Sequence, residues 1–189
     1  MLNACGAGLW RFRTTYRPQS VRIDVITVVN VNDYLIDLGE FGWQAMLTGW
    51  AEILPQTFTI WLVNRFGDVF IITEDGTVHQ LDISGGTLCR VADTRDHFAT
   101  LIDFPQNANN WLMIPLVDQC VKSGMSLQPG QCYGFKIPPL LGGEYELSNI
   151  APVDLAQNYA FLANIWSQTK DVPDGTAVRL VVGPDPKSH

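Results

Sequence analysis

The sequence predicts an α+β fold in a single domain, with a mostly antiparallel sheet around a central β-meander and helices packed against one face. Strand-like segments follow one another between residues 58 and 92, separated only by short polar or glycine-containing stretches. Helical segments gather on either side of this region, and the strict alternation of helix and strand that marks a parallel α/β fold is missing. The length of 189 residues fits one domain of ordinary size.

The composition excludes several classes of protein. A content of 47% apolar, 16% charged and 11% aromatic residues is that of a folded chain rather than a disordered one. No stretch approaches the ~18 uninterrupted apolar residues of a membrane-spanning helix. The net charge of −7 argues against nucleic acid as a direct partner, because phosphate binding relies on clustered Lys and Arg. We therefore expect neither a membrane nor a nucleic acid as a partner.

Charged residues are unevenly distributed along the chain. Residues 1–22 hold four arginines and no acidic residue, which leaves eight basic and nineteen acidic residues, a balance of −11, for the rest. We expect residues 1–30 to be a disordered extension or upstream sequence included by a mis-assigned start, since no apolar segment of a secretory signal is present. The β-branched stretch 21–31 is alternatively an edge strand. Residues 31–182 are expected to form the domain and 183–189 a frayed tail.

The four cysteines, Cys5, Cys89, Cys120 and Cys132, are widely spaced. Neither a CxxC nor an HExxH motif occurs, so we predict no metal site and no cofactor. Cys89 and Cys132 fall in predicted strands and Cys120 in a predicted helix. We interpret them as reduced, structural thiols, which favours a cytoplasmic location.

The elements are predicted in chain order from their periodicity. A helix is expected over residues 43–54, because its apolar residues recur every three or four positions until Pro55. Strands are expected at 58–64, 68–73, 77–83 and 87–92. Their separators contain Asp-Gly and Gly-Gly, which supply the positive φ of tight turns. Strands joined so closely are antiparallel, since a parallel crossover needs a dozen or more residues.

The second half of the chain is expected to be richer in helix. One helix is capped by Asp93 or Thr94 and runs to about Ile102, and a second opens near Asn110 or Pro115 and ends at Gly124. The remaining predictions are a strand at 131–137, a loop at 140–143, a strand at 145–150, a helix at 153–169 and a final strand at 177–182.

Signals of catalysis are weak throughout. His79 and His97 have no spaced partner, and neither a nucleophile elbow nor a phosphate-binding loop occurs. Glu144 and Glu146 share one face of their predicted strand, which is typical of a solvated face or of a partner-binding edge. We predict that the protein is not an enzyme and has no catalytic residue.

Two basic residues stand out in this acidic chain. Arg65 lies in a strand-connecting segment, and Lys136 lies in the glycine-containing segment 130–139. Each is expected either to pair with a carboxylate or to anchor a ligand carboxylate or phosphate.

Several stretches together resemble a known bacterial family. They are Asn32–Asp37, Trp61–Asp68, Asn109–Leu112, and Pro129–Lys136 followed by Leu141–Gly143. The family was long catalogued as a domain of unknown function and is related to the C-terminal domain of immunity proteins that neutralise type VI secretion DNase effectors. A looser similarity links it to the SUKH group of immunity domains. The resemblance spans residues 31–182.

The resemblance implies a non-enzymatic module that binds a toxin or effector protein. Those immunity proteins have an additional N-terminal domain, for which residues 1–30 are too short, so this chain is expected to be a stand-alone member. An acidic domain suits the basic DNA-binding cleft of a DNase. The candidate partner- or ligand-binding residues are Arg65, Asp68, Trp111, Tyr133, Lys136 and Glu144.

The sequence leaves two further questions open. The alternative function is a small-molecule-binding domain or weak enzyme with a pocket near Tyr133–Lys136 and Gly142-Gly143. The oligomeric state is undetermined, because an exposed meander edge also permits a homodimer.

Overall fold

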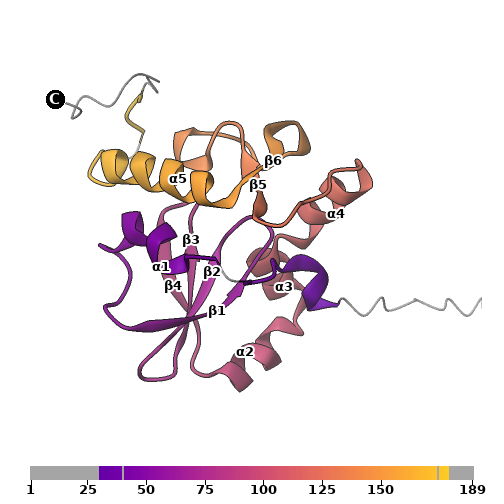
Figure 1. Ribbon diagram of the computed structural model, residues 1–189, viewed down its shortest axis with the longest axis vertical. Helices are drawn as coiled ribbons and strands as arrows, with labels where there is room; N and C mark the ends of the chain where they lie inside the picture. The colour runs from indigo at the N-terminus through magenta and orange to yellow at the C-terminus, as the bar shows by residue number, and fades with distance from the viewer. Residues whose placement is uncertain (1–29, 40, 174, 179–189) are drawn as a thin grey trace, which may run out of the picture.

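The computed structural model describes residues 30–39, 41–173 and 175–178 (Figure 1). The predicted extension, the frayed tail and most of the strands predicted at 21–31 and 177–182 lie outside these residues. Val31 begins a 3-10 helix instead of ending a strand, and residues 177 and 178 are not in a strand.

The elements are η1 (Val31–Tyr34), α1 (Trp43–Met46), η2 (Thr48–Trp50), β1 (Phe58–Val63), β2 (Val69–Thr73), β3 (Val78–Asp82), β4 (Thr87–Ala92), α2 (Arg95–Ile102), α3 (Pro105–Leu112), α4 (Ile114–Lys122), β5 (Gln131–Phe135), η3 (Pro139–Leu141), η4 (Leu147–Asn149), β6 (Ile150–Asp154) and α5 (Leu155–Thr169).

Strands β1 to β4 form an antiparallel sheet in the order β1-β2-β3-β4, which confirms the predicted meander. The turn between β3 and β4 depends on Gly86, whose φ is +65°. A Cβ at this position would also lie 2.2 Å from Cδ1 of Trp166 in α5. Glycine is therefore required at position 86 for two reasons: its backbone has a positive φ, and α5 packs too closely for a side chain.

The α+β class is confirmed, but helices cover both faces of the sheet rather than one. Successive residues of a strand point to opposite faces. On β2, Val69 and Ile71 belong to the cluster that contains Tyr159 of α5, whereas the Phe70 ring packs edge-on against Phe98 of α2, with centroids 5.4 Å apart. The apolar run of β2 is the signature of a strand buried on both sides, which the prediction did not use.

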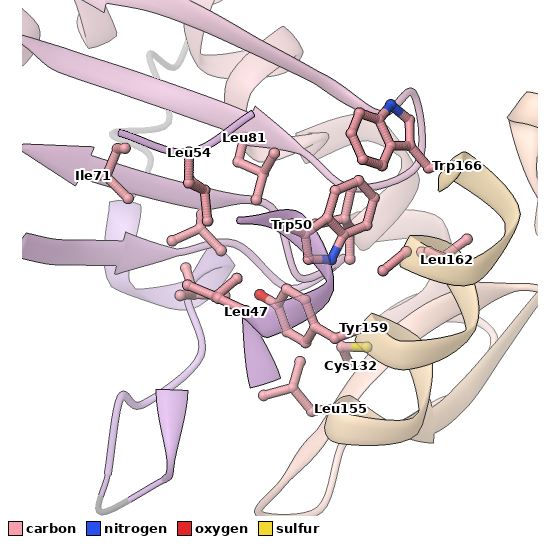
Figure 2. Close-up of a cluster of buried hydrophobic side chains, with 14 residues drawn as sticks. Leu47, Trp50, Leu54, Ile71, Leu81, Cys132, Leu155, Tyr159, Leu162 and Trp166 are labelled. Carbon is pink, nitrogen blue, oxygen red and sulfur yellow. The ribbon is translucent and has the colours of Figure 1, made fainter. Parts of the chain in front are cut away.

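The segment 43–54 is not the single helix that its periodicity predicts. It forms the short helix α1 and the 3-10 turn η2, and both lie against α5. Gly49 approaches α5 so closely that a Cβ there would be 2.6 Å from the Cβ of Ala163. Leu47 and Trp50 still reach the core, because three-residue spacing also places side chains on one side of a 3-10 turn. Figure 2 shows both beside Tyr159.

Helix α2 begins as predicted, with Thr94 as its N-cap, but the next helix is two helices. Helix α3 begins at Pro105, and α4 begins one residue after Met113, which has a left-handed φ of +52°. Proline has no N–H and favours the first turn of a helix, so Pro105 and Pro115 each mark a start. Gly124 ends α4 as predicted, with φ +88°.

A second sheet consists of β5 and β6, which pair antiparallel over their full length. The strand predicted at 145–150 lies instead at Ile150–Asp154, and the predicted strand 131–137 ends at Phe135. Helix α5 begins at Leu155 rather than Val153, because the Asp154 carboxylate caps it by accepting from the Gln157 N–H at 2.8 Å. Pro152 is tolerated in β6 because this strand has a partner on one side only.

Candidate functional site

The turn between β1 and β2 is organised by the side chain of Asn64, which is fully buried. Its Oδ1 accepts hydrogen bonds from the backbone N–H groups of Phe66 and Asp68, each at 2.9 Å. Its Nδ2 donates to Asp68 Oδ2 and to the carbonyl oxygen of Trp111, again at 2.9 Å. One amide side chain therefore fixes the turn, orients a carboxylate and holds the end of α3 against the sheet.

Asp68 is 4% exposed, and its carboxylate links this turn to the end of β3. Its Oδ1 accepts a hydrogen bond from the Ile83 N–H at 3.1 Å. Among the described residues, Asp68 forms no ion pair. The carboxylate thus accepts hydrogen bonds from two neutral donors, Asn64 Nδ2 and the Ile83 N–H, and its negative charge has no cation beside it among the described residues.

Asp68 lies in the wall of a cavity of about 250 Å³ between the meander, the end of α3 and the loop before η4. The wall contains two carboxylates, two aromatic rings and several neutral polar groups, and no Lys, Arg or His. Its residues are Asp68, Gln80, Asp82, Ser84, Thr87, Cys89, Asn110, Trp111, Met113 and Tyr145.

The second carboxylate, Asp82, is positioned by the β3–β4 turn. Its Oδ1 accepts hydrogen bonds from the backbone N–H groups of Ser84 and Gly85, at 2.9 and 2.8 Å. The sequence Asp82-Ile-Ser-Gly-Gly is the pattern of an Asx turn, which fixes the aspartate against the backbone that follows it. Sequence reasoning missed Asp82, although this turn pattern was a usable signal.

The two carboxylates interact electrostatically. Burial, and then the negative charge of Asp82, raise the pKa of Asp68 to about 7. Burial, followed by the charges of Asp82 and Asp68, raises the pKa of Tyr145 to about 12. The cavity therefore has a negative potential at neutral pH, and a cation placed in it would relieve the repulsion.

Tyr145 lies at the outer edge of the cavity, and its neighbours in the chain, Glu144 and Glu146, are exposed. Tyr145 is 53% exposed, and its ring packs edge-on against Phe135, with centroids 5.1 Å apart. One aromatic and two acidic side chains are therefore exposed at consecutive positions here. We call Glu144–Glu146 together with this cavity the acidic site.

Two of the six predicted site residues, Asp68 and Trp111, are in the wall of this cavity. Glu144 is exposed and precedes the wall residue Tyr145 in the chain. Trp111 stacks on Phe98, with centroids 4.8 Å apart and an interplanar angle of 15°, so its ring is held in place. Sequence reasoning did not find Tyr145, although it named the neighbouring Glu144.

The other three predicted residues lie elsewhere. The Arg65 backbone bridges Tyr34 and Tyr133, and Arg65 lines a different hollow, of about 590 Å³. Tyr133 is fully buried and donates its hydroxyl to the Met125 carbonyl oxygen at 3.2 Å. Lys136 Nζ donates to the carbonyl oxygen of Ser148 at 2.7 Å. These contacts give the backbone of Arg65 and the side chains of Tyr133 and Lys136 structural tasks.

The glycines near the alternative pocket have packing roles. A Cβ at Gly134 would lie 2.6 Å from Cγ2 of Val153, and one at Gly143 would lie 1.8 Å from the carbonyl oxygen of Ile137. Close packing therefore explains the absence of a side chain at Gly134 and Gly143, whereas a Cβ at Gly142 would meet nothing within 4 Å.

The cysteines divide by environment. Cys120 and Cys132 are buried, as small hydrophobic residues usually are, and burial raises the pKa of Cys132 to about 12. Cys89 is exposed and lines the cavity. In the described part of the chain, no three His, Cys, Asp or Glu side chains are grouped as metal ligands. No helix there is long and apolar enough to cross a membrane.

A family model matches the second half of the domain. Residues 92–166 match the family T6SS immunity protein Tdi1, C-terminal. This confirms the predicted resemblance over that segment, which contains the stretches 109–112, 129–136 and 141–143 but not 32–37 or 61–68. The matched segment supplies Asn110, Trp111, Met113 and Tyr145 to the acidic site, and the meander supplies the carboxylates of the wall.

Other comparisons give little further similarity. The crystal structure of Atu4351 from Agrobacterium tumefaciens is similar with a TM-score of 0.44 and 20% sequence identity, over 63% of this chain and 59% of that one. This chain thus spans about three fifths of that protein. No curated protein sequence matches the chain.

Proposed function

We propose that this protein is a non-enzymatic, cytoplasmic immunity protein that binds and neutralises a toxin effector of a type VI secretion system through the acidic site. The match of residues 92–166 to a T6SS immunity domain carries the proposal. An immunity protein needs no catalytic groups, only a surface that complements its toxin.

The charge of the chain supports the same function. The net charge of −7 and the acidic site suit a partner with a basic surface, such as the DNA-binding cleft of a nuclease effector. Complementary charge accelerates association and suppresses wrong partners, and its contribution falls with ionic strength. We therefore propose a nuclease effector as the partner, bound in a salt-dependent complex.

Affinity capture followed by protection tests this function. The full chain is used to capture proteins from T6SS-active cells of its source bacterium, and each captured protein is expressed in a sensitive host with and without the chain. We expect one captured protein to be toxic alone and harmless when the chain is present. If no captured protein is toxic, or if the chain fails to protect, the proposal is wrong.

Matched variants locate the interface. Glu144→Gln combined with Glu146→Gln removes two charges from the rim, and we expect it to weaken capture and protection at least tenfold. Glu74→Gln is the control, because Glu74 is exposed in the β2–β3 turn, at the opposite end of the strands. The rim variant removes two charges and the control removes one. A loss of binding free energy in the control that is half of that in the rim variant, or more, would show that net charge, and not the acidic site, drives binding.

A further inference from the structure

We propose that the cavity of the acidic site receives one guanidinium group, the side chain of an arginine on the protein partner, between Asp68 and Asp82. This inference rests on the proposed function, because it names the group of the effector that the site recognises. It is argued from the size of the cavity, its charge and its aromatic walls.

Size limits the occupant. Pockets for drug-sized ligands hold roughly 300–1,000 Å³, and the cavity, at about 250 Å³, falls below that range. It is nevertheless much larger than the ~30 Å³ that one water occupies in the liquid. A single long side chain is an occupant of suitable size.

Charge selects a cation. Asp68 is almost completely buried, lines the cavity and has no ion pair among the described residues, and Asp82 is close enough to repel it. None of the residues in the wall is basic. Burial of a carboxylate without a countercharge costs free energy. A cation on the protein partner therefore interacts especially favourably with this site.

The aromatic walls favour guanidinium over ammonium. Trp111 is fixed by stacking on Phe98, and Tyr145 by its contact with Phe135, so both rings are positioned before any ligand arrives. A guanidinium group is planar, weakly hydrated and able to stack on rings while it donates to two acceptors. An ammonium group is a compact, strongly hydrated charge and gains less from such walls.

The test is a titration of the full chain with methylguanidinium, followed by amide chemical shifts. The N–H groups of Ile83, Ser84 and Gly85 donate to the two carboxylates, so they report directly on an occupant. We expect saturable shifts at these amides with methylguanidinium, smaller ones with methylammonium and none with methylurea. Equal shifts with methylammonium would overturn the assignment to guanidinium, and equal shifts with methylurea would overturn a charged site.

A variant tests the site itself. Asp82→Asn removes the charge but keeps the oxygen that accepts from Ser84 and Gly85, so the turn is preserved. We expect methylguanidinium to bind at least tenfold more weakly to this variant and unchanged to Glu74→Gln. Undiminished binding to Asp82→Asn would overturn the proposal.

Binding is also expected to strengthen between pH 5.5 and pH 8. A cation prefers ionised Asp68, whose pKa lies at about 7. The other titratable groups that act on Asp68 or share its cavity are Asp82, Cys89, Tyr145, Cys132 and Tyr159. Burial is the main cause that raises the pKa values of Tyr145 and Cys132 to about 12, and burial raises the pKa of Tyr159 well above its usual value. Binding that is equal at both pH values would contradict a role for Asp68.

This result is separable from the proposed function. An effector that binds and is neutralised, while methylguanidinium leaves the three amides unmoved, would overturn the guanidinium site and keep the immunity function. Saturable methylguanidinium binding without any toxic partner would overturn the immunity function and keep the cation site.

Discussion

At the residue scale, the buried carboxylate of Asp68 is the most consequential group of the chain. Burial and the nearby Asp82 raise its pKa from 3.8 to about 7, so between these pH values the folded protein retains a proton that the unfolded chain has lost. Unfolding then releases that proton, and the contribution of Asp68 to the free energy of unfolding falls as the pH rises from about 4 to 7. The fall is about 4 kcal/mol at most, at ~1.4 kcal/mol for each pKa unit.

The variant Asp68→Asn isolates this effect. It cannot ionise, and it loses the acceptor for Asn64 Nδ2, so we expect it to be less stable than the wild type at pH 5 by about 1 kcal/mol. At pH 8 the difference should shrink or reverse, because only the wild type has then buried a charge. Urea denaturation at both pH values measures it. A wild-type advantage that grows with pH would contradict the raised pKa.

A second residue-scale prediction concerns Gly49. The change Gly49→Ala places a methyl group 2.6 Å from the Cβ of Ala163, and we expect it to destabilise the fold by about 1–3 kcal/mol through overpacking. The substitution Ala163→Gly removes the opposing methyl group but costs about 1 kcal/mol in helix propensity. The double variant should therefore be more stable than the two separate losses predict. Strict additivity in thermal or urea unfolding would show that the two positions are not in contact.

At the scale of elements, caps and prolines decide where each helix begins. Thr94 Oγ1 accepts from the His97 N–H at 3.0 Å and starts α2, as the sequence predicted. Met113 separates α3 from α4 because its left-handed backbone interrupts the helical path. The sequence contained both prolines that mark these starts, but periodicity alone did not separate the two helices.

The cap of α2 is expected to be worth about 1 kcal/mol. We predict that Thr94→Ala lowers the free energy of unfolding by roughly this amount, because the His97 N–H loses its acceptor. Thr100→Ala is the matched control: this threonine is exposed in the same helix and only bonds back to the Asp96 carbonyl oxygen. Urea unfolding of the two variants gives the comparison. A control that is as destabilised as Thr94→Ala would argue against capping as the cause.

At the scale of the whole molecule, three hydrophobic clusters meet at the turn 64–68. Val63 and Val69 belong to the cluster under α5, Phe66 to the one around Tyr133, and Phe70 to the one under α2 and α3. The Asn64 side chain holds this junction through four hydrogen bonds. Residues of all three hydrophobic clusters therefore meet at this junction.

The variant Asn64→Ala tests this junction. It leaves two buried N–H groups and the Trp111 carbonyl without their partner, and we expect a loss of about 3 kcal/mol or more. Asn109→Ala, on the exposed side of α3, should change stability little. Tryptophan fluorescence and far-UV circular dichroism should give coincident transitions in both proteins. Separate transitions would mean that the clusters unfold independently.

The sequence by itself determined the local features of this protein. The turn glycines, the β-branched runs, the Thr94 cap and the Gly124 stop depend on backbone preferences of a few residues, so the meander, α2 and the end of α4 were predictable. The match of residues 92–166 is likewise carried by sequence, and the motifs at 109–112 and 129–136 pointed to it.

Only the tertiary structure decided the layers and the acidic site. Helices cover both faces of the sheet because α2 and α3 fold back behind it, which no local preference records. The pairing of β2 with β3 places Asp68 beside Asp82, and Tyr145, which is far from both in the sequence, lies in the same cavity wall. The raised pKa of Asp68 follows from that placement, since burial and a neighbouring charge are properties of the folded chain.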